Sequence, residues 1–424
     1  MKRKKRGEEE EEEEKKMEIV WQTPANPPEK QDYIFCNGKR HVRPYYFEFI
    51  AHVKNRWVGK TIVDLFAEEF KGRPYEYYVS AVKCGRIQVD GEMVPVSYVV
   101  KSSQKISHFL HRHEPPVLAL DVRVLKKEPD VVTVWKPASV PQLWLRLSHI
   151  SNVSVIAHCT GNEHEVHPCG QYRKNTVVGI LQAEHDLAPV FRIPTASSKY
   201  SVHRLDRLVS GLLILARNAS KADIFRQQIE AGKVQKQYVA RVIGVFPEHE
   251  KVVDVNINHN AREGRSTAEV GDYCHDMPVK GKTACTKFTR ISTDGIHSIV
   301  QCKPVTGRTH QIRVHLQYAG YPIANDTLYP SKEPVDLSTE GTTADRAATG
   351  SDRSLSPSFD QDCSCQNEES SGEDFSIDPM CTNCPNLGPK GYDGDEEGLW
   401  LHCVRYSGPG WTYECPYPDW ATLS

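Results

Sequence analysis

Apolar residues recur along the chain with two spacings, one typical of helices and one typical of strands. At 61–70 and at 78–82 they stand three and four residues apart, which predicts two helices. Residues 85–92 alternate and run into the pair Asp90-Gly91, which favours a hairpin turn. The wholly apolar run 212–216 is too short to cross a membrane and predicts a buried strand.

The same patterns predict the elements of a second, larger region. They are strands at 131–137, 234–244, 281–288, 298–302 and 399–406, and helices at 177–181, 220–232 and 309–320. We predict that Ser220 and Thr309 cap the last two helices. Residues 311–316 also fit strand alternation, but Gly320 before Pro322 favours a helix that stops there. The fold class predicted is α+β, with a mixed, mainly antiparallel sheet and flanking helices.

Charge and composition divide the chain further. The net charge is only −2, but residues 1–6 are nearly all basic, 8–14 are all Glu, and 335–380 are rich in Asp, Glu, Ser and Thr. We predict a disordered tail and lead-in at 1–44, a small domain at 45–115 and a larger domain at 116–424, with a disordered acidic insert at 333–380. Without the acidic segments the folded part is basic, which suits a partner that carries phosphates.

Cysteine usage and hydropathy indicate the compartment. The 13 cysteines are an odd number and follow no signal peptide, so we expect reduced thiols inside a cell, in the cytoplasm or nucleus, with an organelle as an alternative. No apolar run reaches about 18 residues, so we expect no membrane span. Residues 2–6 are either a nuclear address or a solvated charged tail.

The segment before the apolar run 212–216 carries the candidate chemistry. Asp206 stands between Arg204 and Arg207, and a Ser-Gly pair follows at 210–211. Flanking guanidinium groups keep a carboxylate ionised at neutral pH. Two interpretations remain open from these residues: a structural salt bridge at the start of a strand, or an aspartate held ready as a nucleophile or base.

Two blocks resemble a known family. Residues 203–216 (HRLDRLVSGLLILA) and 306–315 (TGRTHQIRVH) resemble the signatures of the RluA-type RNA pseudouridine synthases, about a hundred residues apart and in the family's order. Lys236-x-Tyr238-x-Ala240 matches a third block. Many members have Thr where this chain has Val209, and we expect no chemical consequence.

The resemblance implies roles for particular residues. Asp206 would be the catalytic carboxylate, with Arg313 as its partner and Arg308 as the alternative. Tyr238 would be the active-site tyrosine, and an ordinary core tyrosine is the alternative. Arg204 would fill the space that an extruded base leaves, with His203 beside it in the substrate site.

The small domain at 45–115 resembles the alpha-L RNA-binding module that precedes the catalytic domain in many family members. A generic small α/β domain is the alternative. In such a module a pair of helices and a hairpin present basic side chains to RNA phosphates. The candidates are Lys71, Arg73, Lys83 and Arg86.

The activity implied is the isomerisation of uridine to pseudouridine in RNA, with tRNA favoured and rRNA as the alternative target. The reaction breaks and remakes one glycosidic bond without oxidation, so we expect no cofactor and no catalytic metal. We expect a monomer. Residues 142–165 and 192–201 interrupt the family's pattern as inserts, either translated intronic sequence or natural loops. They leave a second interpretation open, an RNA-binding form of the same fold whose catalysis is impaired.

The cysteines raise one further possibility. Cys381-x-x-Cys384 is a common half of a zinc site, and Cys403 and Cys415 follow it. The second pair is spaced unlike the usual zinc ribbon. A structural zinc site formed by these four thiols is therefore an alternative to four reduced cysteines.

Overall fold

The computed structural model describes residues 28–70, 73–142, 171–187, 205–261, 263–269, 281–330 and 377–422. The predicted insert at 192–201 lies outside the described residues. So do residues 143–165 of the first insert and 333–376 of the acidic insert.

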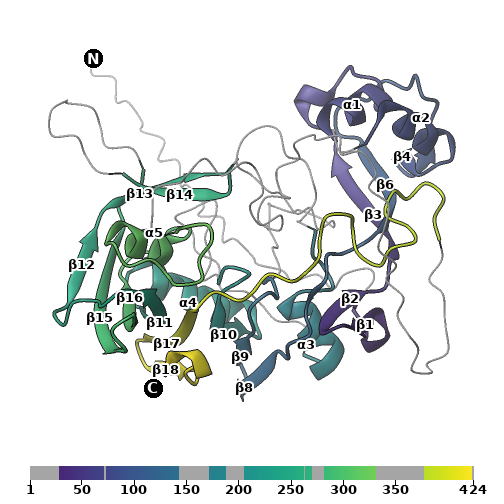
Figure 1. The fold of residues 1–424 in the computed structure, drawn as a ribbon. Coiled ribbons are helices and arrows are strands. Elements are labelled where there is room, and N and C mark those ends of the chain that lie inside the picture. The colour runs from purple at the N-terminus through teal and green to yellow at the C-terminus, as the bar shows by residue number, and fades with distance from the viewer. Residues whose placement is uncertain are drawn as a thin grey trace, which may run out of the picture.

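A sheet of nine strands forms the larger domain (Figure 1). Its strand order is β12-β15-β16-β11-β17-β10-β9-β8, and β18 pairs with β17. The strands are β8 Arg123–Lys127, β9 Val131–Lys136, β10 Ser210–Ala216, β11 Gln235–Ile243, β12 Lys251–Asp254, β15 Cys285–Thr293, β16 His297–Pro304, β17 Leu401–Gly408 and β18 Trp411–Glu414. The pair β10–β17 is parallel, and the other pairs of this sheet are antiparallel. The predicted mixed, mainly antiparallel sheet is confirmed.

Strand β10 is buried on both faces, which explains its unbroken apolar run. Leu212 and Ile214 belong to a core with Phe225 of α4 (Ala219–Glu230) and Leu316 of α5 (Gln311–Tyr318). Leu213 and Leu215 belong to a second core with Val177 and Leu181 of α3 (Val177–His185), among others. Because side chains alternate along a strand, only a strand covered on both sides needs apolar residues at every position.

The small module has its own sheet and core. Strands β3 (Tyr45–His52), β6 (Lys105–Arg112), β4 (Ile87–Val89) and β5 (Glu92–Met93) pair in that order. Helices α1 (Ile62–Glu69) and α2 (Tyr75–Lys83) supply Phe66 and Tyr78 to a core separate from those of the main sheet. Both predicted helices are present. The Asp90-Gly91 turn between β4 and β5 has φ values of 53° and 87°, as a tight hairpin requires.

The lead-in before residue 45 is ordered, contrary to our expectation. After the turn η1 (Lys30–Asp32), strands β1 (Tyr33–Cys36) and β2 (Lys39–Val42) form a hairpin that β7 (Val117–Leu118) extends. Tyr33 and Val42 are buried in the same core as α3. The hairpin was missed because both strands have only four residues and β2 is mostly polar, and their burial depends on partners far along the chain.

Two predicted helix caps are wrong, although both helices exist. The side chain of Asn218, rather than that of Ser220, accepts the backbone N–H of Lys221 at the start of α4. His310 precedes α5 in a left-handed conformation, and no side chain caps that helix. The Gln311 amide oxygen instead accepts the backbone N–H of Arg308 at 2.9 Å, which orients the loop before α5.

The remaining elements lie at the edges of these layers. A two-stranded ribbon, β13 (Asn256–Asn260) and β14 (Arg265–Glu269), lies beside α5 (Figure 1). Short turns η2 (Asn55–Trp57) and η3 (Asp419–Ala421) complete the described elements. Within the described residues, every helix is too short or too polar for a membrane span.

Candidate active site

Asp206 lies in the loop that leads into β10. Its neighbour Leu205 is buried at 5% exposure, whereas the Asp206 side chain keeps 24% of its surface exposed. The backbone N–H of Val209 donates to the carbonyl of Asp206 at 3.1 Å and closes a turn. The loop therefore anchors on the core through leucine and presents the carboxylate outward.

Lys136, at the end of β9, fixes the backbone of this loop through hydrogen bonds. Its ammonium donates to the carbonyl oxygens of Pro137, Arg207 and Val209 at 2.9, 2.9 and 2.7 Å. Complete burial and, to a lesser extent, the Arg207 charge lower the pKa of Lys136 to about 7, while the Asp206 charge opposes the shift. Three carbonyl acceptors match the three hydrogens of an ammonium group, and we assign Lys136 as charged.

Gly211 explains why the loop ends in Ser-Gly. Its φ is 121°, and a Cβ atom there would lie 2.4 Å from the backbone nitrogen and oxygen of Cys403 in β17. Any larger residue would force apart the parallel pair β10–β17 and move the Asp206 loop. The Ser210 hydroxyl contacts Nδ1 of His402 at 2.8 Å and joins the same two strands.

Arg313 of α5 reaches Asp206, but its closest partner is another aspartate. Its Nη1 lies 3.9 Å from Oδ2 of Asp206. Its Nε and Nη2 donate to the two carboxylate oxygens of Asp326 at 2.6 and 2.8 Å. The predicted contact between Arg313 and Asp206 is therefore a long one, and the two-pronged pair forms with Asp326. Burial alone would lower the pKa of Arg313, but the hydrogen bonds and charge of Asp326, with Asp206, raise it.

His310 is a second neighbour of Asp206. Its Nε2 lies 3.8 Å from Oδ2 of Asp206, and its Nδ1 contacts the Tyr329 hydroxyl at 2.9 Å. That hydroxyl already accepts the backbone N–H of Ser266 at 2.8 Å. Its own hydrogen is therefore available to Nδ1, which favours a hydrogen on the nitrogen that faces Asp206.

Tyr238 is buried in β11 and points its hydroxyl at another tyrosine. The Tyr238 and Tyr406 hydroxyls are 2.9 Å apart. Burial raises the pKa of both phenols well above the ordinary value, and the nearby Asp206 charge contributes at Tyr238. Both therefore stay neutral at physiological pH, so Tyr238 can donate or relay a proton but cannot act as a resident phenolate.

The other predicted substrate residues are dispersed or fall outside the described part of the chain. Arg308 donates through Nε to the carbonyl of Thr283 at 2.9 Å, and no contact places it at Asp206 among the described residues. Lys83 is exposed at the end of α2, and the Arg73 guanidinium lies 4.4 Å from the Tyr77 ring centre. His203, Arg204 and Lys71 lie outside the described residues.

Arg86 does not present a free guanidinium to RNA, as we had expected. It forms a two-pronged pair with Asp378, with distances of 2.6 and 2.7 Å, and the Asp378 side chain is fully buried. The Arg86 guanidinium instead binds the segment at residue 378 to the small module.

The four cysteines suggested for zinc do not meet. Cys403 and Cys415 are buried in the core of the main sheet. Cys381 and Cys384 lie instead beside the end of β6, near His111. The prediction that Cys403 and Cys415 join the zinc site is therefore wrong. Cys403 lies in β17 and Cys415 follows β18, and neither approaches Cys381 and Cys384.

Sequence reasoning missed four contributors to the site, namely Lys136, His310, Asp326 and Tyr406. Lys136, His310 and Tyr406 lie within segments that the sequence analysis names, at 131–137, 306–315 and 399–406. Asp326 stands 13 residues after Arg313, and the intervening helix and Gly320 turn bring it back alongside. Identifying Asp326 as the partner of Arg313 requires the geometry of this turn, which the spacing of apolar residues does not give.

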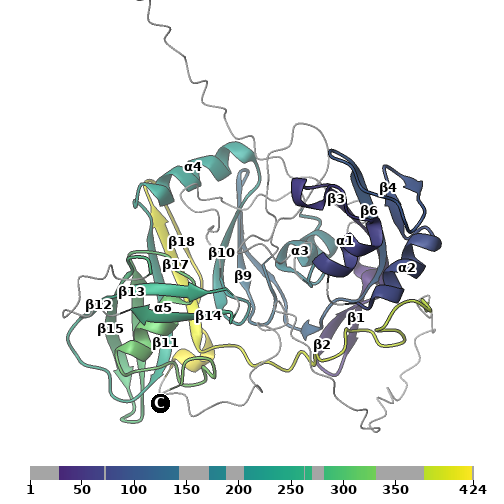
Figure 2. The same ribbon diagram turned by 90° about the horizontal axis from the view of Figure 1, so that it is seen from above.

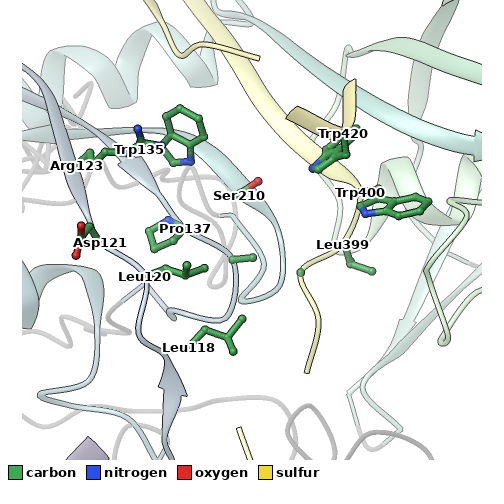
Figure 3. A pocket seen from close by; sticks show the side chains of 12 residues that line it. Leu118, Leu120, Asp121, Arg123, Trp135, Pro137, Ser210, Leu399, Trp400 and Trp420 are labelled. Atoms are coloured by element: carbon green, nitrogen blue, oxygen red, sulfur yellow. The ribbon is translucent and has the colours of Figure 1, made fainter. Parts of the chain in front are cut away.

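A cavity of about 540 Å³ lies apart from these groups (Figure 3). Trp135, Ser210, Leu118 and Trp400 are among its lining residues, and Asp206, Tyr238 and Arg313 are not. We therefore place the candidate chemistry at the Asp206 loop rather than in this cavity.

The geometry makes the Asp206 loop a candidate active site. The partly exposed Asp206 carboxylate lies 3.9 Å from the buried Arg313 guanidinium beside a mixed sheet, and such a carboxylate is a candidate for acid–base or nucleophilic catalysis. Residues 183–318 match the family described as RNA pseudouridylate synthase.

Whole-chain relatives extend that match. The chain is 65% identical over 413 residues to RNA pseudouridine synthase 7 of Oryza sativa subsp. japonica, with 96% of each chain covered. It is 61% identical over 407 residues to RNA pseudouridine synthase 7 of Arabidopsis thaliana, covering 96% of this chain and 92% of that one. It is 29% identical over 431 residues to the tRNA pseudouridine(31) synthase of Saccharomyces cerevisiae, covering 91% and 96%. The chain belongs to the RluA-type family of RNA pseudouridine synthases, and it is an isomerase that acts on RNA.

Proposed function

We propose that this chain converts uridine to pseudouridine in tRNA and that Asp206 is the carboxylate that carries the reaction. The bond between the ribose and nitrogen 1 of uracil breaks, the base rotates, and a bond to carbon 5 replaces it. Carbon 5 loses a proton and nitrogen 1 gains one, so the product is an isomer of the substrate.

The position of Asp206 is the observation that carries the proposal. Of the groups gathered here, it combines an exposed carboxylate with two cationic or proton-bearing neighbours, His310 at 3.8 Å and Arg313 at 3.9 Å. A carboxylate with nearby positive charge stays ionised and is available as a nucleophile or base. Neither of these two contacts is shorter than 3.8 Å, so each is a long ion pair rather than a close two-pronged one.

Tyr238 supports the same site from the core. Its neutral ring lies in the strand beside β17, and its hydroxyl is held by Tyr406. A ring in this position offers the uracil an apolar surface and a proton donor. The target base must leave its stack to reach a carboxylate, and Arg204 is the residue that we propose for the vacated space.

The choice of tRNA is supported by the yeast relative, whose name gives tRNA as its target and which covers 91% of this chain. The small module with exposed Lys83 offers a surface for RNA phosphates. Pseudouridine mapping in cells with and without the protein tests this choice. We expect a tRNA position to lose pseudouridine, and a loss confined to rRNA would contradict it.

The alternative, an RNA-binding form with impaired catalysis, is less well supported. Asp206, Tyr238 and Arg313 all stand in the described part of the site, and the relatives that match almost the whole chain carry the name of a synthase. We therefore propose the active enzyme.

Asp206→Asn tests the central role directly. We expect tritium release from RNA labelled at uridine carbon 5 to fall by at least about 10³-fold, because asparagine removes the charge and keeps the shape. RNA affinity should stay within about threefold, since phosphate contacts supply most of it. Asp395→Asn, at a carboxylate that is 70% exposed, is the matched control and should keep full activity. Turnover near the wild-type rate in Asp206→Asn would refute the assignment.

A further inference from the structure

Four metal-binding side chains converge away from the Asp206 loop. They are His111 and His113 at the end of β6, and Cys381 and Cys384, which follow about 270 residues later in the chain. One ligand atom from each lies within 4.8 Å of every other. Both histidines are buried, and both cysteines are partly buried.

The distances between the ligand atoms match those around a tetrahedrally coordinated metal ion. His111 Nδ1 and His113 Nε2 are 3.2 Å apart, and Cys384 Sγ lies 3.2 Å from the first and 3.5 Å from the second. Zinc bonds of about 2.0–2.3 Å in a tetrahedron separate neighbouring ligand atoms by roughly 3.3–3.8 Å. The three separations among His111, His113 and Cys384 therefore fit an ion at the centre, and Cys381 Sγ lies within 4.8 Å of the other three atoms.

We propose that these four residues bind one structural zinc ion. The donor set is two thiolates and two imidazoles, and the Cys-x-x-Cys spacing is the common one for such sites. Two thiolates balance the charge of Zn²⁺, which suits a site with buried ligands. His111 and His113 stand two residues apart at the end of a strand, so their side chains leave on the same side.

The surroundings of His113 select its ligating nitrogen. Its Nδ1 lies 3.2 Å from the carbonyl oxygen of Leu387, which places the hydrogen on Nδ1 and leaves the Nε2 lone pair for the metal. A carbonyl or carboxylate behind a ligating histidine is the usual arrangement in zinc sites. Leu387 lies three residues beyond Cys384, so the segment that supplies the thiols also orients this imidazole.

The proposed ion would fasten the segment that returns the chain to the main sheet. Figures 1 and 2 show this segment, in yellow, running from beside β6 to β17. The Arg86–Asp378 pair and the packing of Met380 on the module core hold its start. Farther on, Glu396 pairs with Arg207 at 3.1 Å, next to Asp206. A zinc ion bound by Cys381 and Cys384 would thus link the small module to the segment that contacts the Asp206 loop through Glu396.

Metal content of the purified full chain tests the proposal independently of its activity. The protein is expressed with a tag that lacks histidines, equilibrated with zinc, and passed over a chelating resin. We expect about one zinc ion per chain in the wild type. The double variant Cys381→Ser/Cys384→Ser should hold less than about 0.1, and Cys36→Ser, which removes a thiol on β1, should keep the full amount.

X-ray absorption at the zinc edge keeps the test decisive if the double variant does not fold. The wild-type ion should show two sulfur and two nitrogen ligands. A wild-type chain that holds less than about 0.1 zinc ion per chain would overturn the proposal. A disulfide between Cys381 and Cys384 would also overturn it. A folded double variant with a full complement of zinc, loss of zinc in Cys36→Ser, or any other ligand set would also overturn it.

Discussion

Asp326 grips Arg313 through two buried hydrogen bonds, and the remaining nitrogen of that guanidinium faces Asp206 at 3.9 Å. The side chains of Arg313 and Asp326 are 3% and 1% exposed, so the pair is shielded from water. Asp326 thus compensates the charge of Arg313 and orients its Nη1 towards Asp206. Asp206 therefore receives positive charge from a guanidinium that Asp326 holds in place.

Replacing Asp326 with Asn should harm both stability and turnover. The change leaves the buried Arg313 without its countercharge, and the free energy of unfolding should fall by roughly 3 kcal/mol. We also expect Arg313 to move towards Asp206 and hold it tightly, so that kcat falls at least about tenfold while RNA affinity persists. Urea unfolding and tritium release measure the two effects, and a shift of the pH–rate profile would separate positioning from simple loss of fold.

Asp223→Asn is the matched control for that variant. Asp223 pairs with Arg226 on α4, but its side chain is 43% exposed. Exposed ion pairs contribute at most about 1 kcal/mol, so the control should be near the wild type in both measurements. If Asp326→Asn were equally mild, Asp326 would have no positioning role.

Tyr238→Phe removes one hydroxyl from the core beside the site. We expect turnover to fall by about 10²-fold, the lower range for a lost proton donor, while thermal unfolding stays close to the wild type. The raised pKa of this phenol excludes a base role near neutral pH, so the rate loss should be similar from pH 6 to 8.

Tyr406→Phe makes the comparison specific. It removes the partner of the 2.9 Å hydroxyl contact but keeps the Tyr238 hydroxyl, so turnover should fall less than about tenfold. Equal losses in the two variants would mean that the pair acts only through packing. Near-normal turnover in Tyr238→Phe would make this tyrosine structural.

Features that a short stretch of sequence encodes could be predicted. The apolar run of β10, the Asp90-Gly91 turn, and helix α5 with Gly320 after it are each visible in a few neighbouring residues. The alternation that we read in β11 also holds, since Tyr238 and Ala240 face one core and Val239 faces another.

Contacts between distant segments could not be predicted in the same way. Lys136 donates to carbonyl oxygens about 70 residues later, and a carbonyl leaves no mark in the sequence. His310 reaches Asp206 from a left-handed backbone position, which periodicity does not reveal. Cys381 and Cys384 lie beside His111 and His113, which stand about 270 residues earlier in the chain, and no local pattern reveals that contact.

His402 should make the fold sensitive to acid. It is fully buried in β17, where its Nδ1 contacts the Ser210 hydroxyl at 2.8 Å and its Nε2 lies 3.1 Å from the carbonyl oxygen of Pro416. Burial lowers its pKa to about 4, and the Lys136 charge adds to the shift. In the unfolded chain an ordinary histidine titrates near 6.5.

The unfolded chain therefore binds a proton at this residue before the folded chain does, and stability falls as pH drops from about 6.5 to 4. The expected loss from His402 is about 3 kcal/mol across that window, with no further loss below it. His402→Gln should be less stable at pH 7 yet show a flatter decline, whereas His185→Gln, at an exposed histidine, should keep the wild-type slope. Urea unfolding at half-unit pH steps measures this, and identical slopes in the wild type and His402→Gln would show that His402 is not the acid-sensitive group.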